Sequence, residues 1–216
     1  MNSKRIIFWA GFVIILGLIV WGLIAAFNKP GPGAELTAPP PVTAADHVIG
    51  NQNAPVTIIE YGDFQCPACG YYYPTVERLI AESSSTMRLV FRHFPLSQHQ
   101  NAMAAAMTSE AAAVQGKFWE MYSLLYQNQD AWSNLNDPSS IFAGYAAQLG
   151  LNMTEYTSDI GSSTLRDVIT SDQDGGIAIG IDQTPTFFVN GKVITNPPSY
   201  DQFKALIDAA ASSSSQ

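Results

Sequence analysis

The pattern of apolar and polar positions separates a long apolar segment at the start of the chain from a mixed region after it. Residues 6–27 contain no charged side chain, and a helix of that length spans roughly 33 Å, enough for a bilayer core. The pattern predicts a membrane anchor over residues 1–28. A long signal peptide is the alternative, but the length of the apolar stretch favours an uncleaved anchor.

The next segment is rich in proline. Residues 30–41 hold five prolines and two glycines, a composition typical of an extended linker, which we expect over residues 29–45. Lys4 and Arg5 precede the apolar segment, so the short leading end is predicted to be cytoplasmic. The rest of this single-pass cell membrane protein would lie on the extracytoplasmic side.

A strand, a helix and a second strand are predicted next. Val56–Tyr61 and Met87–Phe91 are short apolar runs, the first of them β-branched and preceded by Pro55, and both patterns indicate buried strands. The helical stretch between them runs from Pro67 to about Glu82. Strand, helix and strand in this order favour a right-handed parallel unit.

The pattern becomes helical over about residues 97–180 and returns to strands afterwards. Helices are predicted at residues 101–114, 118–126, 141–149 and from 163 or 164 to 179. Thr186–Val189 and Lys192–Ile194 flank Asn190-Gly191, a strong hairpin signal. We expect a closing helix over 200–211 and a frayed tail over 212–216. The folded domain would therefore cover 46–211, with an all-helical insertion.

The charge of the chain argues against a nucleic-acid partner. Three of the ten Lys and Arg precede Pro30, whereas all eighteen Asp and Glu follow it, so the remaining chain carries 7 − 18 = −11. Nucleic-acid binding requires clustered positive charge. The scattered acidic residues are typical of a solvated surface.

Both cysteines of the protein lie in the sequence Cys66-Pro67-Ala68-Cys69, where the first strand gives way to the helix. Pro67 suits the first helical position, so Cys66 is predicted to be the N-cap. Unpaired backbone N–H groups and the helix dipole favour its thiolate there. Cys69 lies one turn further on and can attack a mixed disulfide at Cys66. Redox catalysis needs no cofactor beyond this cysteine pair.

Three other roles for the cysteines compete with redox catalysis. A structural disulfide closing so short a loop would stabilise by roughly 2 kcal/mol or less. A zinc site needs two more ligands, and His47, His93 and His99 are not paired at ligand spacing, so no metal is expected. Two reduced core cysteines fit poorly with a Pro-Ala insert that opens a helix.

Taken together, these elements resemble the DsbA-type branch of the thioredoxin superfamily, the extracytoplasmic thiol–disulfide oxidoreductases. The resemblance rests on Glu60-Tyr-Gly-Asp-Phe-Gln-Cys-Pro-Ala-Cys and on Gln183-Thr-Pro-Thr-Phe-Phe-Val-Asn-Gly191, and it covers about residues 46–211. It implies an α/β thioredoxin fold with an inserted helical subdomain, here preceded by the predicted transmembrane helix.

The resemblance also implies roles for particular residues. Pro185 would be a cis-proline opposite the cysteines, and Thr184, Pro67 and Ala68 would contact the substrate. An ordinary trans turn at Thr184-Pro185 is the alternative. Glu60 matches a buried acid that exchanges a proton with the second cysteine, although a surface carboxylate at a strand end is equally compatible with the pattern. Asp63 is interpreted as a turn residue and His93 as structural.

The resemblance implies that the cysteine pair introduces disulfides into reduced client proteins and is reoxidised by a quinone-linked membrane partner of the DsbB or vitamin K epoxide reductase type. Ala68 departs from the best-known oxidase pattern, in which a histidine often stands there; alanine cannot stabilise a thiolate by charge. A reductase or isomerase of the same fold, or a tethered binding module without catalysis, are the alternative functions.

Overall fold

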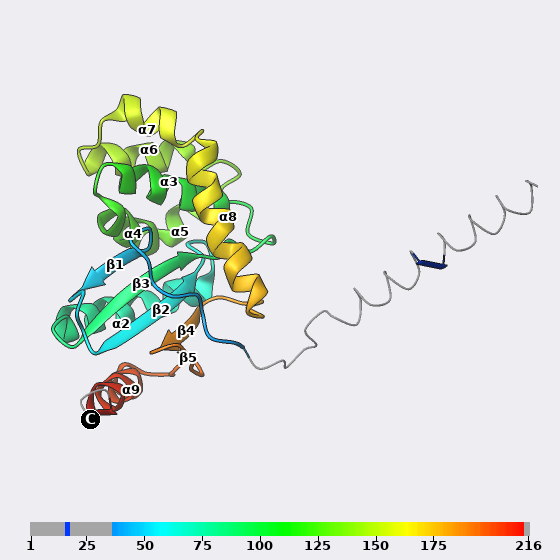
Figure 1. Cartoon of the computed structure of the whole chain (residues 1–216). Helices are drawn as coiled ribbons and strands as arrows, with labels where there is room; N and C mark the ends of the chain where they lie inside the picture. The colour runs from blue at the N-terminus through cyan, green and yellow to red at the C-terminus, as the bar shows by residue number, and fades with distance from the viewer. Residues whose placement is uncertain (1–15, 18–35, 214–216) are drawn as a thin grey trace, which may run out of the picture. The chain divides into compact units, whose positions relative to one another are not determined.

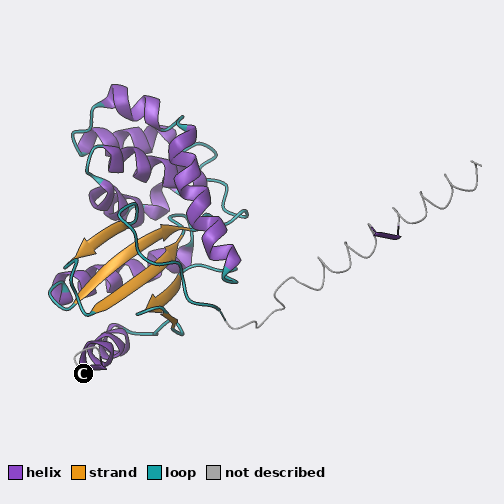
Figure 2. Cartoon of the chain, viewed as in Figure 1, coloured by secondary structure: helices purple, strands orange, loops and turns teal. Residues whose placement is uncertain are grey.

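The computed structural model describes residues 16–17 and 36–213, and its ordered centre is a mixed five-stranded sheet (Figure 2). The strands lie in the order β1-β3-β2-β4-β5. Their bounds are β1 His47–Gly50, β2 Val56–Gly62, β3 Met87–His93, β4 Thr186–Val189 and β5 Lys192–Val193. β2 and β3 are parallel, whereas β1 pairs with β3, β4 with β2, and β5 with β4 in antiparallel fashion.

The predicted strand–helix–strand unit is present as β2, α2 and β3. Helix α2 covers Pro67–Ser83 and continues through Pro74. The parallel register places Val56 opposite Met87 and Gly62 opposite His93, so both strands end at the same edge of the sheet. The predicted hairpin is also present, with Asn190 at a φ of 47° and Gly191 at 77° between β4 and β5.

Alternation along β2 assigns its side chains to two cores. Val56 and Ile58 face α2 and the closing helix α9, Tyr200–Ser213. Ile59 and Tyr61 face the opposite side, where they pack with Phe94. Burial of both faces explains why the strand sequence is almost continuously apolar.

The helical insertion follows β3 and packs beyond one edge of the sheet (Figure 1). Its helices are α3 Ala102–Val114, α4 Phe118–Gln127, α5 Gln129–Trp132, α6 Ser139–Gln148, α7 Met153–Asp159 and α8 Ser163–Ala178. Aromatic side chains from α4 join Phe64 and Phe91 in one core cluster. The insertion and the sheet are therefore continuous in their packing.

Helix α8 returns the chain to the sheet and contacts β3. It remains helical through Gly175 and Gly176. A Cβ at Gly176 would lie 2.8 Å from Phe94 Cδ2 and 3.1 Å from Tyr61 Cδ1. The glycine therefore permits close approach of the helix to the sheet, and this packing stabilises the segment.

The predicted linker over 29–45 is too long at its carboxyl end. Residues from Leu36 belong to the compact unit that contains the sheet, and Leu36 and Val42 pack against its second core. Arg92 donates to the carbonyls of Pro40 and Pro41, at 3.0 and 3.2 Å. The prolines expose backbone carbonyls without competing N–H donors, which suits this docking.

The predicted membrane anchor lies outside the described residues except for positions 16–17. In the part of the chain that the structure describes, none of the helices has the length and apolar character needed to cross a membrane.

Candidate active site

The site begins where β2 passes into α2. Cys66 is the N-cap of that helix, with φ −66° and ψ 121°, and Pro67 stands at its first turn. The backbone N–H of Cys66 donates to the carbonyl of Asp63 at 3.0 Å. The strand, the tight turn and the proline thus place the first sulfur at the start of the helix.

Asp63 holds this turn through its carboxylate. Its Oδ1 accepts the backbone N–H of Gln65 at 2.7 Å, which confirms its interpretation as a turn residue. Its Oδ2 accepts the N–H of Leu96 at 2.9 Å and meets His99 Nδ1 at 2.6 Å. The active-site turn is therefore tied to the loop that follows β3.

The expected cis bond between Thr184 and Pro185 is present, and it lies beside the first cysteine. The Cys66 thiol donates to the carbonyl of Thr184 at 3.3 Å. These residues are 118 positions apart in the sequence, and the pairing of β4 with β2 brings them together.

Several hydrogen bonds lower the pKa of Cys66 to about 5, and the largest contribution comes from the Cys69 side chain. The Thr184 side chain and the backbone N–H groups of Cys69 and Ala68 also favour the charged sulfur, against the opposing effect of burial. The buried Thr184 hydroxyl has no hydrogen-bond partner among the described residues. It can donate once the sulfur is ionised.

The two sulfurs differ in access and in acidity. Cys66 is 6% exposed and Cys69 is 0% exposed, whereas Pro67 and Ala68 between them are exposed. Complete burial, followed by the interaction with Cys66, raises the pKa of Cys69 well above its ordinary value. An incoming sulfur can therefore reach Cys66, and Cys69 is placed to react only from inside.

Glu60 lies on β2 beneath the cysteines and is 1% exposed, so the interpretation as a surface carboxylate is wrong. Burial raises its pKa to about 8, although a hydrogen bond from the Tyr122 hydroxyl, at 3.3 Å, partly offsets the shift. Its charge also acts on Cys69. A buried acid that titrates near neutral pH thus lies within electrostatic reach of the second sulfur.

Tyr122 belongs to a set of aromatic residues that recur at helical spacing along α4, a pattern typical of core packing. Its ring does pack in the core, against Phe64, Tyr73 and Tyr126. Sequence periodicity could not show that its hydroxyl also meets Glu60, because that contact joins the insertion to β2.

The fold also brings His47, His93 and Glu110 together, a cluster that the sequence spacing did not indicate. One ligand atom from each lies within 4.8 Å of the others. The three residues are contributed by β1, β3 and α3, so only the tertiary structure assembles them.

A sheet of this order, with a Cys-x-x-Cys helix start opposite a cis-proline, defines a thioredoxin-type protein. The family model described as Thioredoxin matches residues 42–209. The chain belongs to the thioredoxin family, as a DsbA-like member of the superfamily.

Two solved structures show the same fold. BdbD from Bacillus subtilis in its oxidised form superposes with a TM-score of 0.70 at 23% identity, covering 82% of this chain and 99% of that one. Wolbachia pipientis alpha-DsbA1 superposes with a TM-score of 0.69 at 25% identity, covering 81% and 94%. The coverage extends over the helical insertion as well as the sheet.

Among curated proteins, the Na(+)/H(+) antiporter NhaA 3 of Salinispora tropica is 38% identical over 169 residues, which are 78% of this chain and 25% of the antiporter. The chain thus spans about a quarter of the length of that relative.

Proposed function

We propose that this protein is an extracytoplasmic thiol–disulfide oxidoreductase that introduces disulfides into client proteins. The observation that carries the proposal is the environment of Cys66, a barely exposed sulfur at a helix start whose pKa is lowered to about 5. A cysteine in such surroundings is reactive, whereas a buried structural cysteine is inert.

The reaction begins with the Cys66–Cys69 disulfide. A client thiolate attacks Cys66 Sγ, the bond between the two cysteines breaks, and Cys69 leaves with the electron pair and takes up a proton. A second client thiolate then attacks the client sulfur of the mixed disulfide and releases Cys66 as a thiolate. The client loses two electrons and the cysteine pair gains them.

The direction of transfer follows from which redox form the site stabilises. The contacts from Cys69, Thr184 and Ala68 favour the Cys66 thiolate, and a thiolate exists only in the reduced protein. Stabilising the reduced form makes the disulfide a stronger oxidant. The stabilised Cys66 thiolate therefore supports an oxidase, even though Ala68 stands where a histidine would add positive charge.

The proposal includes a membrane location and a redox partner. The apolar residues 6–27 would anchor the domain on the extracytoplasmic side, close to a quinone-linked protein of the DsbB or vitamin K epoxide reductase type that restores the disulfide. Tethering raises the effective concentration of the two proteins. Ion exchange is not part of the proposal, because the match to the antiporter involves a quarter of its length.

A peptide-oxidation assay tests the proposal. The purified oxidised chain is mixed with a peptide that carries two reduced cysteines. One peptide disulfide should form for each Cys66–Cys69 disulfide consumed, and mass spectrometry would count both. A protein whose disulfide is intact but which oxidises no peptide would rule out the oxidase.

The alternative functions suggested by the sequence predict different redox states of the cysteine pair in the cell. A reductase or isomerase of the same fold works from the dithiol, so its cysteine pair would be mostly reduced, whereas that of an oxidase would be mostly a disulfide. A binding module without catalysis would hold clients without a covalent bond. Alkylation of free thiols in intact cells, followed by mass measurement, separates the first two.

Replacing Glu60 with glutamine should slow reactions at Cys69. With a pKa of about 8, Glu60 can give Cys69 its proton when that sulfur leaves and remove it when Cys69 attacks. We expect the attack of Cys69 on a mixed disulfide to slow roughly 10²-fold. In the parent protein the rate of this attack should increase as the pH rises through about 8, and in the variant this increase should disappear. Stopped-flow measurements from pH 6 to about 9 would record this.

The matched control is Glu155→Gln, on the exposed surface of α7, which should leave the rate unchanged.

The pH dependence of protein stability gives a second measure of the Glu60 pKa. Because folding raises the pKa of Glu60 from 4.5 to about 8, the free energy of unfolding should fall as the pH rises across that interval. Glu60→Gln should remove this fall, and an unaltered rate profile would exclude the proton-transfer role.

A further inference from the structure

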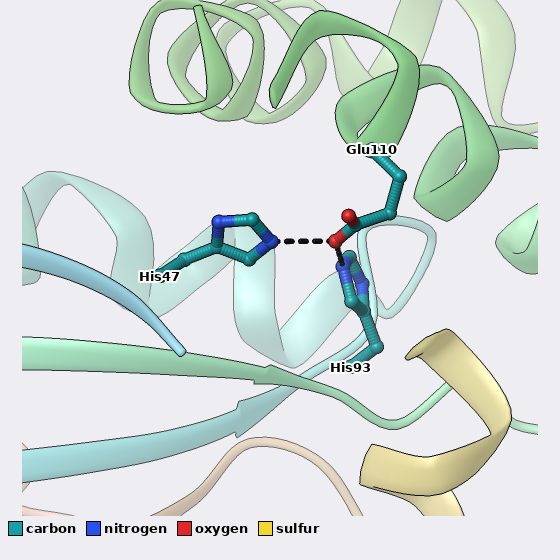
Figure 3. A group of neighbouring side chains, drawn as sticks. All are labelled: His47, His93 and Glu110. Carbon is teal, nitrogen blue, oxygen red and sulfur yellow. Dashed lines mark hydrogen bonds and ion pairs between the residues drawn. The ribbon is translucent and has the colours of Figure 1, made fainter. Parts of the chain in front are cut away.

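The cluster formed by His47, His93 and Glu110 has a geometry unlike an ordinary surface ion pair (Figure 3). The Nε2 atoms of both histidines meet the same carboxylate oxygen, Oε1 of Glu110, at 2.6 and 2.7 Å. The side chains of His93 and Glu110 are 1% and 5% exposed, and that of His47 is 17% exposed. Three ligand atoms thus converge where two of the side chains are buried and that of His47 is partly exposed.

Neighbouring rings hold the imidazoles in this orientation. Phe118 stacks on His47 with a centroid distance of 3.6 Å and an interplanar angle of 6°, and it meets the edge of His93 at 6.0 Å. On another element, the Asp172 carboxylate accepts the backbone N–H of His93 at 3.0 Å. The donors are therefore held in place by packing, which is what a metal site requires.

The donor set suits a transition metal better than Ca²⁺ or Mg²⁺. Two imidazoles and one carboxylate are ligands typical of Zn²⁺ and its neighbours, whereas the hard cations prefer oxygen alone. Zn²⁺ binds nitrogen at about 2.0–2.1 Å, so tetrahedral ligand atoms lie about 3.3 Å apart. Small side-chain rotations would open the present contacts of 2.6 and 2.7 Å to that spacing.

The hydrogen bonding of the cluster leaves Nδ1 of His93 as the atom that would carry the ring proton in a metal-bound state. His93 uses Nε2 to reach Glu110, and its buried Nδ1 has no partner among the described residues. A metal takes the lone pair of Nε2, and the ring then carries its proton on Nδ1. Glu110 supplies the carboxylate oxygen that both imidazoles approach, at 2.6 and 2.7 Å.

We propose that His47, His93 and Glu110 bind a divalent transition-metal ion of the zinc type, with a water molecule as the fourth ligand on the side of His47. The ion would join β1 and β3 of the sheet to α3 of the insertion. This role is structural and independent of thiol chemistry, because neither cysteine belongs to the cluster.

Titration of the full-length chain with Co²⁺ tests the site, because four-coordinate Co²⁺ absorbs visibly and can be displaced by Zn²⁺. Cys66→Ser and Cys69→Ser are both introduced, so that no thiolate competes for metal. We expect one Co²⁺ to bind per chain and to give the absorption spectrum of four-coordinate N/O ligation. Addition of Zn²⁺ should abolish this spectrum, and the unfolding temperature should rise with Zn²⁺ concentration. Ca²⁺ should not raise it.

Single substitutions decide whether the cluster is the site. His47→Gln removes the most exposed ligand and should weaken Zn²⁺ binding roughly 10–100-fold or more, as should Glu110→Gln. His99→Gln, at the histidine paired with Asp63, should bind like the parent. Absence of a Co²⁺ spectrum, or equal affinity in His47→Gln and the parent, would overturn the proposal and leave the cluster as a hydrogen-bonded link between sheet and insertion.

Discussion

Replacing Cys66 with serine should reduce peptide oxidation to the uncatalysed rate, whereas replacing Cys69 with serine should trap clients on Cys66. Cys66 is the sulfur with access to solvent, and Cys69 is fully buried behind it. Loss of a nucleophile costs roughly 10³-fold or more in rate. Without Cys69, a mixed disulfide formed at Cys66 lacks the internal sulfur that resolves it.

Two measurements check this asymmetry. Peptide oxidation by the Cys66→Ser variant gives the rate, and mass spectrometry of the Cys69→Ser variant, purified without reductant, should show covalent adducts at Cys66. The variant lacking both cysteines provides the background for each. Adducts of equal yield on Cys69 in the Cys66→Ser variant would contradict the assignment of the two roles.

The Cys66 thiolate should persist to pH values at which ordinary cysteines are protonated. With a pKa of about 5, Cys66 would be about 90% ionised at pH 6, against roughly 0.3% for a cysteine of pKa 8.5. A thiolate of lower pKa is also intrinsically less nucleophilic, which reduces the advantage in ionised fraction by roughly 40-fold. Alkylation of Cys66 at pH 6 should therefore be roughly tenfold faster than that of an ordinary cysteine. The rate of reaction with iodoacetamide against pH should show a midpoint near 5.

The Cys69→Ala variant tests the physical cause. The Cys69 side chain makes the largest contribution to lowering the pKa of Cys66, so the midpoint should move upward in this variant. Serine at the same position keeps a hydroxyl donor and should move it less. A midpoint near 8 to 9 in the parent protein would show that the helix start does not stabilise the thiolate.

The stability of the reduced protein should follow the same titration. Folding lowers the pKa of Cys66 from 9.0 to about 5, so the folded state favours the thiolate. This contribution is complete above pH 9, declines as the pH falls, and is absent below about 5. Denaturant unfolding of the reduced parent, compared with Cys66→Ala, would isolate it.

Local patterns in the sequence were sufficient to predict the elements at the centre of the fold. The β-branched run at Val56, the proline after Cys66 and the Asn190-Gly191 pair each specify their own conformation, and β2, α2 and the β4–β5 hairpin are present as predicted. The cis bond before Pro185 and its place beside the cysteines could be predicted only from the family resemblance, because no local signal distinguishes a cis from a trans bond.

Features that depend on contacts distant in sequence were not predictable in the same way. β1 was missed because His47–Gly50 is short and gains its structure from pairing with β3. Burial of Glu60 depends partly on Tyr122, which lies 62 residues away. The contact between His47 and Glu110 joins residues 63 positions apart, and no spacing rule for metal ligands covers that separation.

The separation between Cys66 and Thr184 also has a consequence for biosynthesis. A chain emerging from the ribosome or a translocation channel presents its thiols long before the segment with Pro185 has been made. Until β4 joins the sheet, Cys66 lacks the Thr184 contacts that favour its ionised form. The part of the thiolate stabilisation that comes from Thr184 can therefore arise only when synthesis is almost finished.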